Sequence, residues 1–122
     1  MFSGWLLVAE KKECGGAEIY KDNLESVEDC AAKCMGTASM FIFGTNDFGK
    51  IRCGTAQEVG NSKGKKDGCS CFCETTATTN GICPQIDSIG YRLYKYASQG
   101  NHYFVLLLLL LLLLLVKILF YS

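Results

Sequence analysis

Residues 26–34, SVEDCAAKC, decide how this chain of 122 residues folds. Ser26 can cap a helix, and Asp29 stands three residues further on, which is the spacing of a capping box with Asp in place of the usual Glu. Cys30 and Cys34 are four residues apart, so a helix directs both thiols to one face. Gly36 follows where a helix commonly ends. The stretch therefore predicts a short helix that is linked to another element through two cysteines.

The chain contains eight cysteines, all between residues 14 and 83. This even number in a short chain indicates a disulfide framework and an oxidising compartment. Each bridge in a small secreted domain typically adds roughly 2–4 kcal/mol, so we expect the fold to depend on its bridges. Spacing alone leaves the pairing open. The predicted half-cystines are Cys14, Cys30, Cys34, Cys53, Cys69, Cys71, Cys73 and Cys83.

Five stretches carry strand patterns. Residues 39–44 are apolar on both faces, as in a central strand that is covered on both sides, and we expect residues 40–45 to form a hairpin with residues 50–55. In residues 69–73, CSCFC, the alternation of a strand places three thiols on one face. The other predicted strands are residues 17–21, followed by a turn at Asp22-Asn23, and residues 89–96.

Two kinds of chemistry compete with structural roles for the cysteines and the histidine. Clustered thiols at Cys69, Cys71 and Cys73 can bind zinc or copper(I), but structural zinc sites usually use Cys-x-x-Cys pairs, which the sequence lacks, so a disulfide role is favoured. His102 is the only histidine and lies beside the apolar tail, where it cannot readily orient a nucleophile. We therefore predict no enzyme activity, no metal and no cofactor.

The net charge and one predicted loop indicate which kinds of partner the chain could bind. The formal net charge is zero, which creates no strong field, so nucleic acid is not an expected partner. Phe48 is an aromatic residue in a predicted turn, close to Asp47 and Lys50. Exposed loop residues of this kind often carry binding, so these three residues are the candidate ligand contact.

The apolar tail includes ten consecutive leucines, residues 106–115. At about 1.5 Å per residue, residues 103–121 nearly span the ~30 Å hydrocarbon core of a bilayer. A membrane-spanning helix is favoured, with Lys117 reaching the headgroups. A glycosylphosphatidylinositol signal and a low-complexity end without a selected role are the alternatives.

The sequence resembles the PAN/apple domain family. The matching residues are the Cys-x-x-x-Cys helix at residues 26–34, the aromatic strand at 40–43, Arg52-Cys53, and the closing GYRLY at 90–94. The resemblance covers about residues 14–96. It implies an α+β fold, in which an antiparallel sheet of about five strands packs around one helix. It also implies a non-catalytic module that recognises proteins or carbohydrates outside the cell.

The sequence departs from the family at one cysteine. Family members usually carry a cysteine just before the aromatic strand, bonded to the helix, whereas residues 38–40 are Ala-Ser-Met. We therefore expect at least one helix cysteine to bond to the cluster in residues 69–73, and the other to Cys53 or the same strand. Cys14 then pairs with a remaining late cysteine.

The expected segments are a signal remnant at residues 1–13, a PAN/apple-like domain at 14–97, a juxtamembrane linker at 98–102 and a transmembrane or anchor segment at 103–122. Residues 1–9 are mostly apolar but lack a basic leader, so a mature N-terminal segment is the alternative there.

These expectations combine into a recognition or adhesion module at the cell surface that binds a protein or carbohydrate. The domain lies outside the cell, and a single-pass helix or a lipid anchor along residues 103–121 holds it to the membrane. The alternative is a secreted disulfide-rich effector or structural protein, toxin-like, whose tail is removed or irrelevant.

Overall fold

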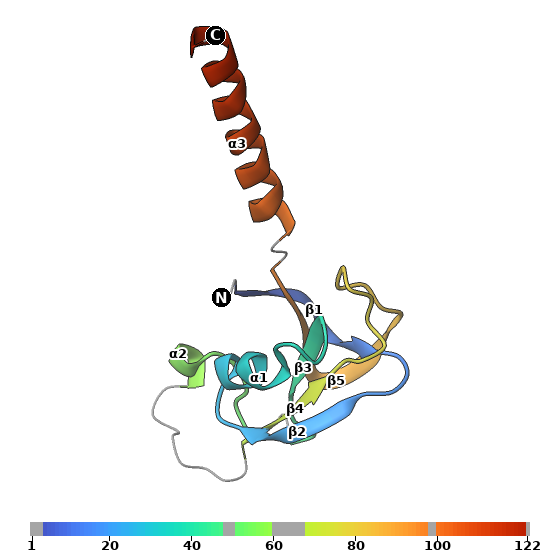
Figure 1. The fold of residues 1–122 in the computed structure, drawn as a ribbon. Helices are drawn as coiled ribbons and strands as arrows, with labels where there is room; N and C mark the ends of the chain where they lie inside the picture. The colour runs from blue at the N-terminus through green and yellow to red at the C-terminus, as the bar shows by residue number, and fades with distance from the viewer. Residues whose placement is uncertain (1–3, 48–50, 60–67, 98–99, 122) are drawn as a thin grey trace.

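The centre of the molecule is β3 (Met40–Gly44), a strand in which every residue is buried. The computed structural model describes residues 4–47, 51–59, 68–97 and 100–121, and for residues 100–103 the backbone only. Around β3 the chain forms a five-stranded antiparallel sheet with the order β1-β5-β3-β4-β2. The other elements are β1 (Trp5–Cys14), β2 (Ile19–Leu24), α1 (Val27–Cys34), α2 (Ala56–Val59), β4 (Cys69–Cys73), β5 (Gln85–Tyr96) and α3 (Gly100–Tyr121) (Figure 1).

The helix predicted at residues 26–34 is confirmed as α1. The Ser26 side chain accepts a hydrogen bond from the backbone N–H of Asp29 at 3.3 Å, which caps the first turn. Val27, Ala31 and both cysteines of α1 are buried against the sheet. The α+β fold class, with one helix packed on a sheet of about five strands, is therefore confirmed.

Both faces of β3 are covered, as its sequence predicts. On one face, α1 and the cysteines of β4 enclose Phe41 and Phe43. On the other face, Met40 and Ile42 pack with Leu93 of β5, and Cys14 and Cys83 belong to the same cluster. Covering both faces explains why residues 40–43 show no alternation between apolar and polar side chains.

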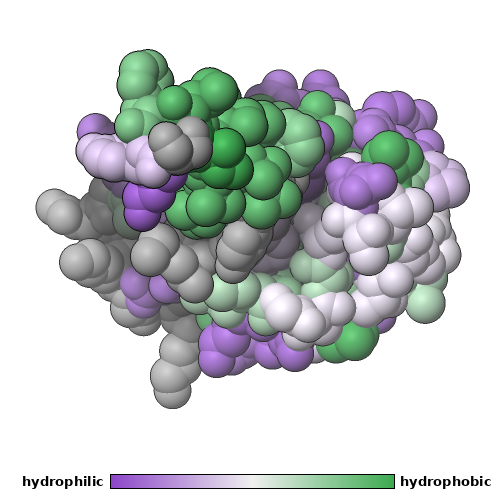
Figure 2. Space-filling model, turned by 45° about the horizontal axis from the view of Figure 1, so that its top comes forward, coloured by the Kyte–Doolittle hydropathy of each residue, from purple (hydrophilic) through white to green (hydrophobic). Residues whose placement is uncertain are grey.

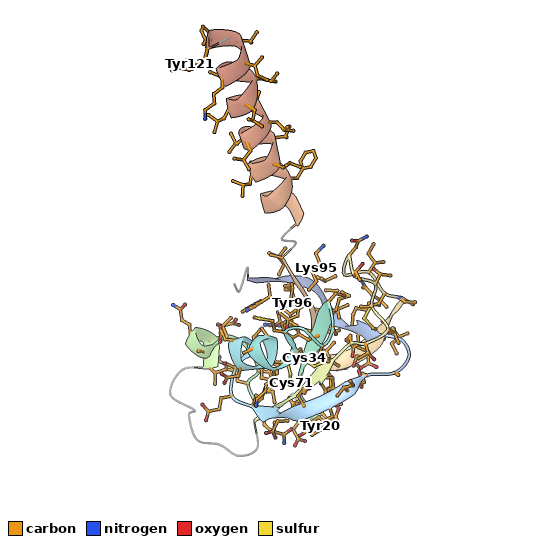
Figure 3. All side chains as sticks on the ribbon, in the orientation of Figure 1. Tyr20, Cys34, Cys71, Lys95, Tyr96 and Tyr121 are labelled. Atoms are coloured by element: carbon orange, nitrogen blue, oxygen red, sulfur yellow. A yellow bond between two sulfur atoms is a disulfide. The ribbon has the colours of Figure 1, made fainter. Side chains whose placement is uncertain are left out.

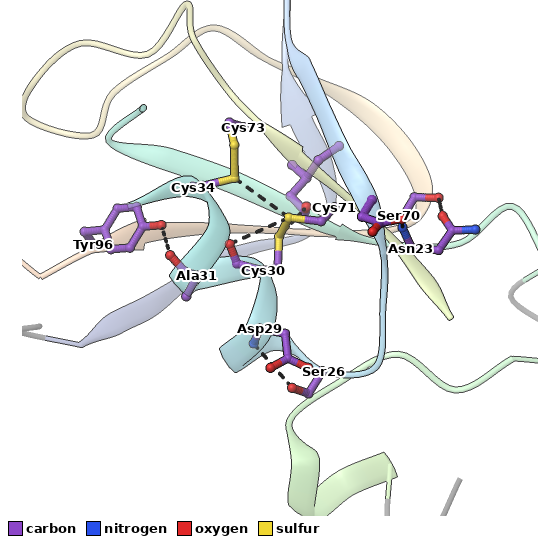
Figure 4. The surroundings of a disulfide bond; sticks show 12 residues. Asn23, Ser26, Asp29, Cys30, Ala31, Cys34, Ser70, Cys71, Cys73 and Tyr96 are labelled. Carbon is purple, nitrogen blue, oxygen red and sulfur yellow. Dashed lines mark hydrogen bonds between the residues drawn. A yellow bond between two sulfur atoms is a disulfide. The ribbon is translucent and has the colours of Figure 1, made fainter. Parts of the chain in front are cut away.

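Four disulfides hold the domain together, and Figure 4 shows the two that join α1 to β4. Cys30 and Cys34 of α1 both bond to β4, as expected for a helix without a partner cysteine before β3. Cys14 bonds to a late cysteine, again as expected. The four pairs are Cys14–Cys83, Cys30–Cys71, Cys34–Cys73 and Cys53–Cys69.

The predicted hairpin between residues 40–45 and 50–55 is wrong. The strand β3 pairs with β4 on one side and β5 on the other, so neither edge is open to a hairpin partner. Residues 51–55 form no strand and lead into α2. The predicted turn at Asp22-Asn23 is also wrong, because both residues lie inside β2, where Asn23 is opposite Ser70.

The sheet begins earlier than the domain boundary expected at Cys14. Trp5 is opposite Tyr96, and β1 pairs with β5 from there to Cys14. The sheet therefore includes residues 5–13, which the sequence analysis left outside the domain. The signal-remnant interpretation of residues 1–13 stays a prediction.

The helix α3 extends away from the domain (Figure 1). Its segment Phe104–Tyr121 has 18 residues, and none of it is buried inside the protein. At about 1.5 Å per residue it is about 27 Å long, close to the thickness of a bilayer core. Figure 2 shows its side chains as a hydrophobic surface beside a domain of mixed polarity. By length and composition, α3 can therefore span a membrane.

Candidate ligand-binding pocket

The pairing between β1 and β5 is irregular at two places, and the larger irregularity lies at Lys11. Glu10 lies opposite Arg92 and Lys12 lies opposite Asp87, so Lys11 alone faces the four residues 88–91. Bulges of this kind redirect side chains and are frequent beside functional sites. The backbone of Lys11 has φ = 58°, in the left-handed region that a lysine rarely adopts. The bulge therefore holds a strained residue at the edge of the sheet.

Two glycines allow β5 to bulge. Gly90 has φ = 94°, which only glycine adopts readily, and its carbonyl accepts a hydrogen bond from the N–H of Thr45 at 3.1 Å. A Cβ on Gly44 would lie 2.1 Å from the same carbonyl oxygen, so the end of β3 can approach the bulge only without a side chain.

A pocket of about 410 Å³ lies beside this bulge. That volume falls in the range of small-ligand sites, roughly 300–1,000 Å³. Four separate parts of the chain line it: the middle of β1, the end of β3, the segment before α2 and the bulge of β5. The lining residues are Glu10, Lys11, Phe43, Thr45, Ile51, Arg52, Cys53, Ile89, Gly90, Tyr91 and Arg92.

Positive charge predominates among the lining side chains. Lys11, Arg52 and Arg92 are cationic and Glu10 is the one acid, which makes the formal charge of the lining +2. Arg92 is partly neutralised, because its guanidinium lies 3.4 Å from Glu10 and 3.6 Å from Glu58. No ion pair among the described residues involves Lys11 or Arg52. The pocket therefore favours a ligand that carries a negative group.

The Glu58 that contacts Arg92 is held by its own helix. Thr55 and Glu58 form a reciprocal capping box at the start of α2, with the Thr55 hydroxyl 3.0 Å from the Glu58 carboxylate. Hydrogen bonds from Thr55 lower the pKa of Glu58, and Arg92 lowers it further. The spacing Thr-x-x-Glu is a sequence signal for this cap, which was not among the predictions above.

Apolar and aromatic side chains make up another part of the lining. Phe43 is buried, and burial raises the pKa of the Tyr91 phenol above its ordinary value. Ile89, at the bulge, is 63% exposed. An apolar side chain this open beside cationic groups suits a ligand with both apolar and acidic parts.

One residue of the predicted ligand contact, Asp47, lies next to this pocket. Asp47 is exposed, and its backbone joins two lining residues, since its N–H donates to the Thr45 hydroxyl and its carbonyl accepts from the N–H of Ile51. Phe48 and Lys50 lie outside the described residues. The lining residues named above were not predicted as ligand contacts, and Cys53 was predicted as a half-cystine only. Gly90 inside a strand pattern was the one signal that indicated a bulge.

All eight predicted cysteines are bonded in disulfides, so they offer no thiolate to a metal. The Sγ atoms of Cys30, Cys34 and Cys71 lie within 4.8 Å of one another, but each belongs to a disulfide. Metal binding by cysteine requires a thiolate. The group could bind a metal only after both bridges were reduced.

A buried acid lies on the other face of the sheet. Glu74 has no exposed surface, and its carboxylate accepts a hydrogen bond from the N–H of Cys14 at 2.7 Å. Burial, the neighbouring Glu18 and Glu13 raise the pKa of Glu74 to about 9. One carboxyl oxygen of Glu74 and one of Glu18 are buried without a described donor. Burial beside two other acids therefore favours the protonated form of Glu74.

No protein-family model, curated protein or solved structure matches this chain.

Proposed function

We propose that the chain is a membrane-tethered recognition module of the PAN/apple type, which binds an acidic protein or carbohydrate ligand outside the cell. The observation that carries this proposal is the pocket beside the β5 bulge, with its net positive lining. The helix α1 packed on a five-stranded antiparallel sheet is the arrangement that the PAN/apple resemblance implies, whereas its two disulfides to β4 depart from the family pattern.

The position of the pocket suits a tethered receptor. Ile89 and Tyr96 are seven residues apart on β5, which is roughly 23 Å along a strand. Because α3 begins shortly after Tyr96, the pocket lies away from the end of β5 that leads to the tether. A ligand on another cell or in solution can therefore reach the pocket without meeting the membrane.

The proposed activity is binding without catalysis. A hydrolytic or transfer site needs a nucleophile with a base in hydrogen-bonding reach. Besides Glu10, Thr45 and Tyr91, the lining supplies arginine, lysine and apolar side chains, which are groups that hold an acidic ligand in place.

The test is a glycan and ectodomain binding array probed with the full chain in phospholipid nanodiscs. Arg52→Glu reverses a charge in the lining, and the matched control Lys21→Glu reverses an exposed charge on β2. We expect an acidic partner whose signal is lost with Arg52→Glu and kept with Lys21→Glu. If Arg52→Glu binds the partner as well as Lys21→Glu does, or if the array shows no partner, the proposal that the pocket binds an acidic ligand is contradicted.

A further inference from the structure

Four exposed apolar side chains gather at the end of the sheet nearest α3. On β1, Leu6 is 54% exposed, Leu7 50% and Val8 37%. In the loop before β5, Ile82 is 65% exposed. These four residues and Trp5 are called the apolar rim below.

Strand pairing places the rim at this end. Leu6 lies opposite Lys95 and Leu7 opposite Tyr94, close to the end of β5. The loop that carries Ile82 reaches the same end, because a Cβ on Gly81 would lie 3.1 Å from the Lys95 side chain. Figure 3 shows Lys95 on the side of the domain that faces α3, and Tyr20 on the opposite side.

The chain itself limits how far the rim can lie from the membrane helix. Tyr96 and Phe104 are eight residues apart. Four extended links and four helical steps reach at most about 20 Å. Trp5 is directly opposite Tyr96, so the start of β1 is held within reach of the headgroup layer wherever α3 enters a bilayer.

The chemistry of the rim matches that layer. Trp5 is partly exposed and packs edge-on against Tyr94, with ring centroids 5.4 Å apart. Tryptophan and tyrosine are enriched at membrane interfaces, where one part of the ring is apolar and the other is wet. Leucine, valine and isoleucine at this position bury apolar surface among the lipids instead of exposing it to water.

We propose that the apolar rim lies on the surface of the bilayer that α3 crosses, and that this contact holds the domain with its pocket facing away from the membrane. The proposal rests on the proposed membrane tether. It goes beyond that tether, because a helix joined by a short linker leaves the domain free to rotate, whereas a second contact defines its orientation.

The test uses the full chain in phosphatidylcholine nanodiscs and the fluorescence of Trp5, the only tryptophan in the chain. Brominated phosphatidylcholine quenches tryptophan that lies in or near the acyl region, and aqueous iodide quenches tryptophan in water. We expect strong quenching by the brominated lipid and weak quenching by iodide. In the double variant Leu6→Ser/Leu7→Ser, we expect the lipid quenching to be lost and iodide quenching to increase.

The matched control is Ile86→Ser, which changes an apolar residue of similar exposure, 47%, near the other end of β5. It should leave both kinds of quenching unchanged, and disulfide mapping checks that each variant is folded. If the chain stays in nanodiscs but the brominated lipid does not quench Trp5, the proposed contact between the apolar rim and the bilayer is wrong and the tether stands. If the chain does not enter nanodiscs, both the membrane tether and the contact of the apolar rim with the bilayer are wrong.

Discussion

Glu74 illustrates how a single buried residue makes the stability of this domain depend on pH. Its pKa is raised from 4.5 in the unfolded chain to about 9 in the folded chain, because it is buried and lies beside Glu18. Between these values the folded state holds a proton that the unfolded state has lost. The stabilisation is therefore complete below the unfolded pKa, and it falls as the pH rises toward the folded pKa.

We predict that the free energy of unfolding decreases from pH 5 to pH 8, by on the order of 1 kcal/mol per pH unit at most. In Glu74→Gln this slope should largely disappear, because the amide resembles the protonated acid and can still accept from the N–H of Cys14. Urea unfolding under non-reducing conditions measures both slopes.

The control for that series is Glu28→Gln, which changes an exposed carboxylate whose hydrogen bond to the N–H of Ala56 an amide can keep. It should retain the slope of the unmodified chain. A Glu74→Gln variant with the same pH dependence as the unmodified chain would show that Glu74 is ionised in the folded state.

At the scale of elements, α1 is held to β4 by two bridges that lie side by side. The Sγ atoms of Cys34 and Cys71, which belong to different bridges, are 3.8 Å apart. The cysteines of the two bridges are separated by 41 and 39 positions in the sequence, so the bridges close almost the same loop. While one bridge remains, the other constrains only a few additional residues.

We therefore predict that the two bridges are not additive. Removing Cys30–Cys71 alone by alanine substitution should cost about 2 kcal/mol, because the remaining loop is short, and removing Cys34–Cys73 as well should cost about 4 kcal/mol more. Denaturant unfolding of the two single-bridge variants and the double variant measures the difference. Equal costs for the first and second removal would contradict the redundancy.

The same element shows what the sequence could predict. The cap at Ser26, the spacing of Cys30 and Cys34 and the alternation of residues 69–73 are local signals, and α1 and β4 were predicted from them. Their linkage was expected from the missing family cysteine before β3, with Cys53 left open as a partner for one helix cysteine. The hairpin of residues 40–45 was wrong, because the partners of β3 are distant in sequence. Local turn residues cannot show that a strand is already paired on both sides.

The strand β1 was missed for a related reason. Residues 6–9 are all apolar and residues 10–13 are all charged, so the stretch has no strand period. Its conformation comes from pairing with β5, and Cys14 is bonded 69 residues away. The pocket was missed because its lining comes from four separate segments, and only the three-dimensional fold brings Lys11, Arg52 and Ile89 together.

At the scale of the whole molecule, the lysines can show on which side of the proposed membrane the domain and the end of α3 lie. Lys21 and Lys33 are exposed on the domain, and Lys117 is near the C-terminal end of α3. If α3 spans the membrane, its charged end and the domain lie on opposite sides. A chain released as a secreted effector would instead present all its lysines to the same solution.

The most direct test of a tethered module outside the cell is amine labelling of intact cells with a membrane-impermeant reagent, followed by alkaline extraction and peptide mapping of the chain that remains in the membrane. The account predicts label on Lys21 and Lys33 in intact cells, and label on Lys117 only after permeabilisation. Recovery of the chain in the medium, or label on Lys117 in intact cells, would contradict it.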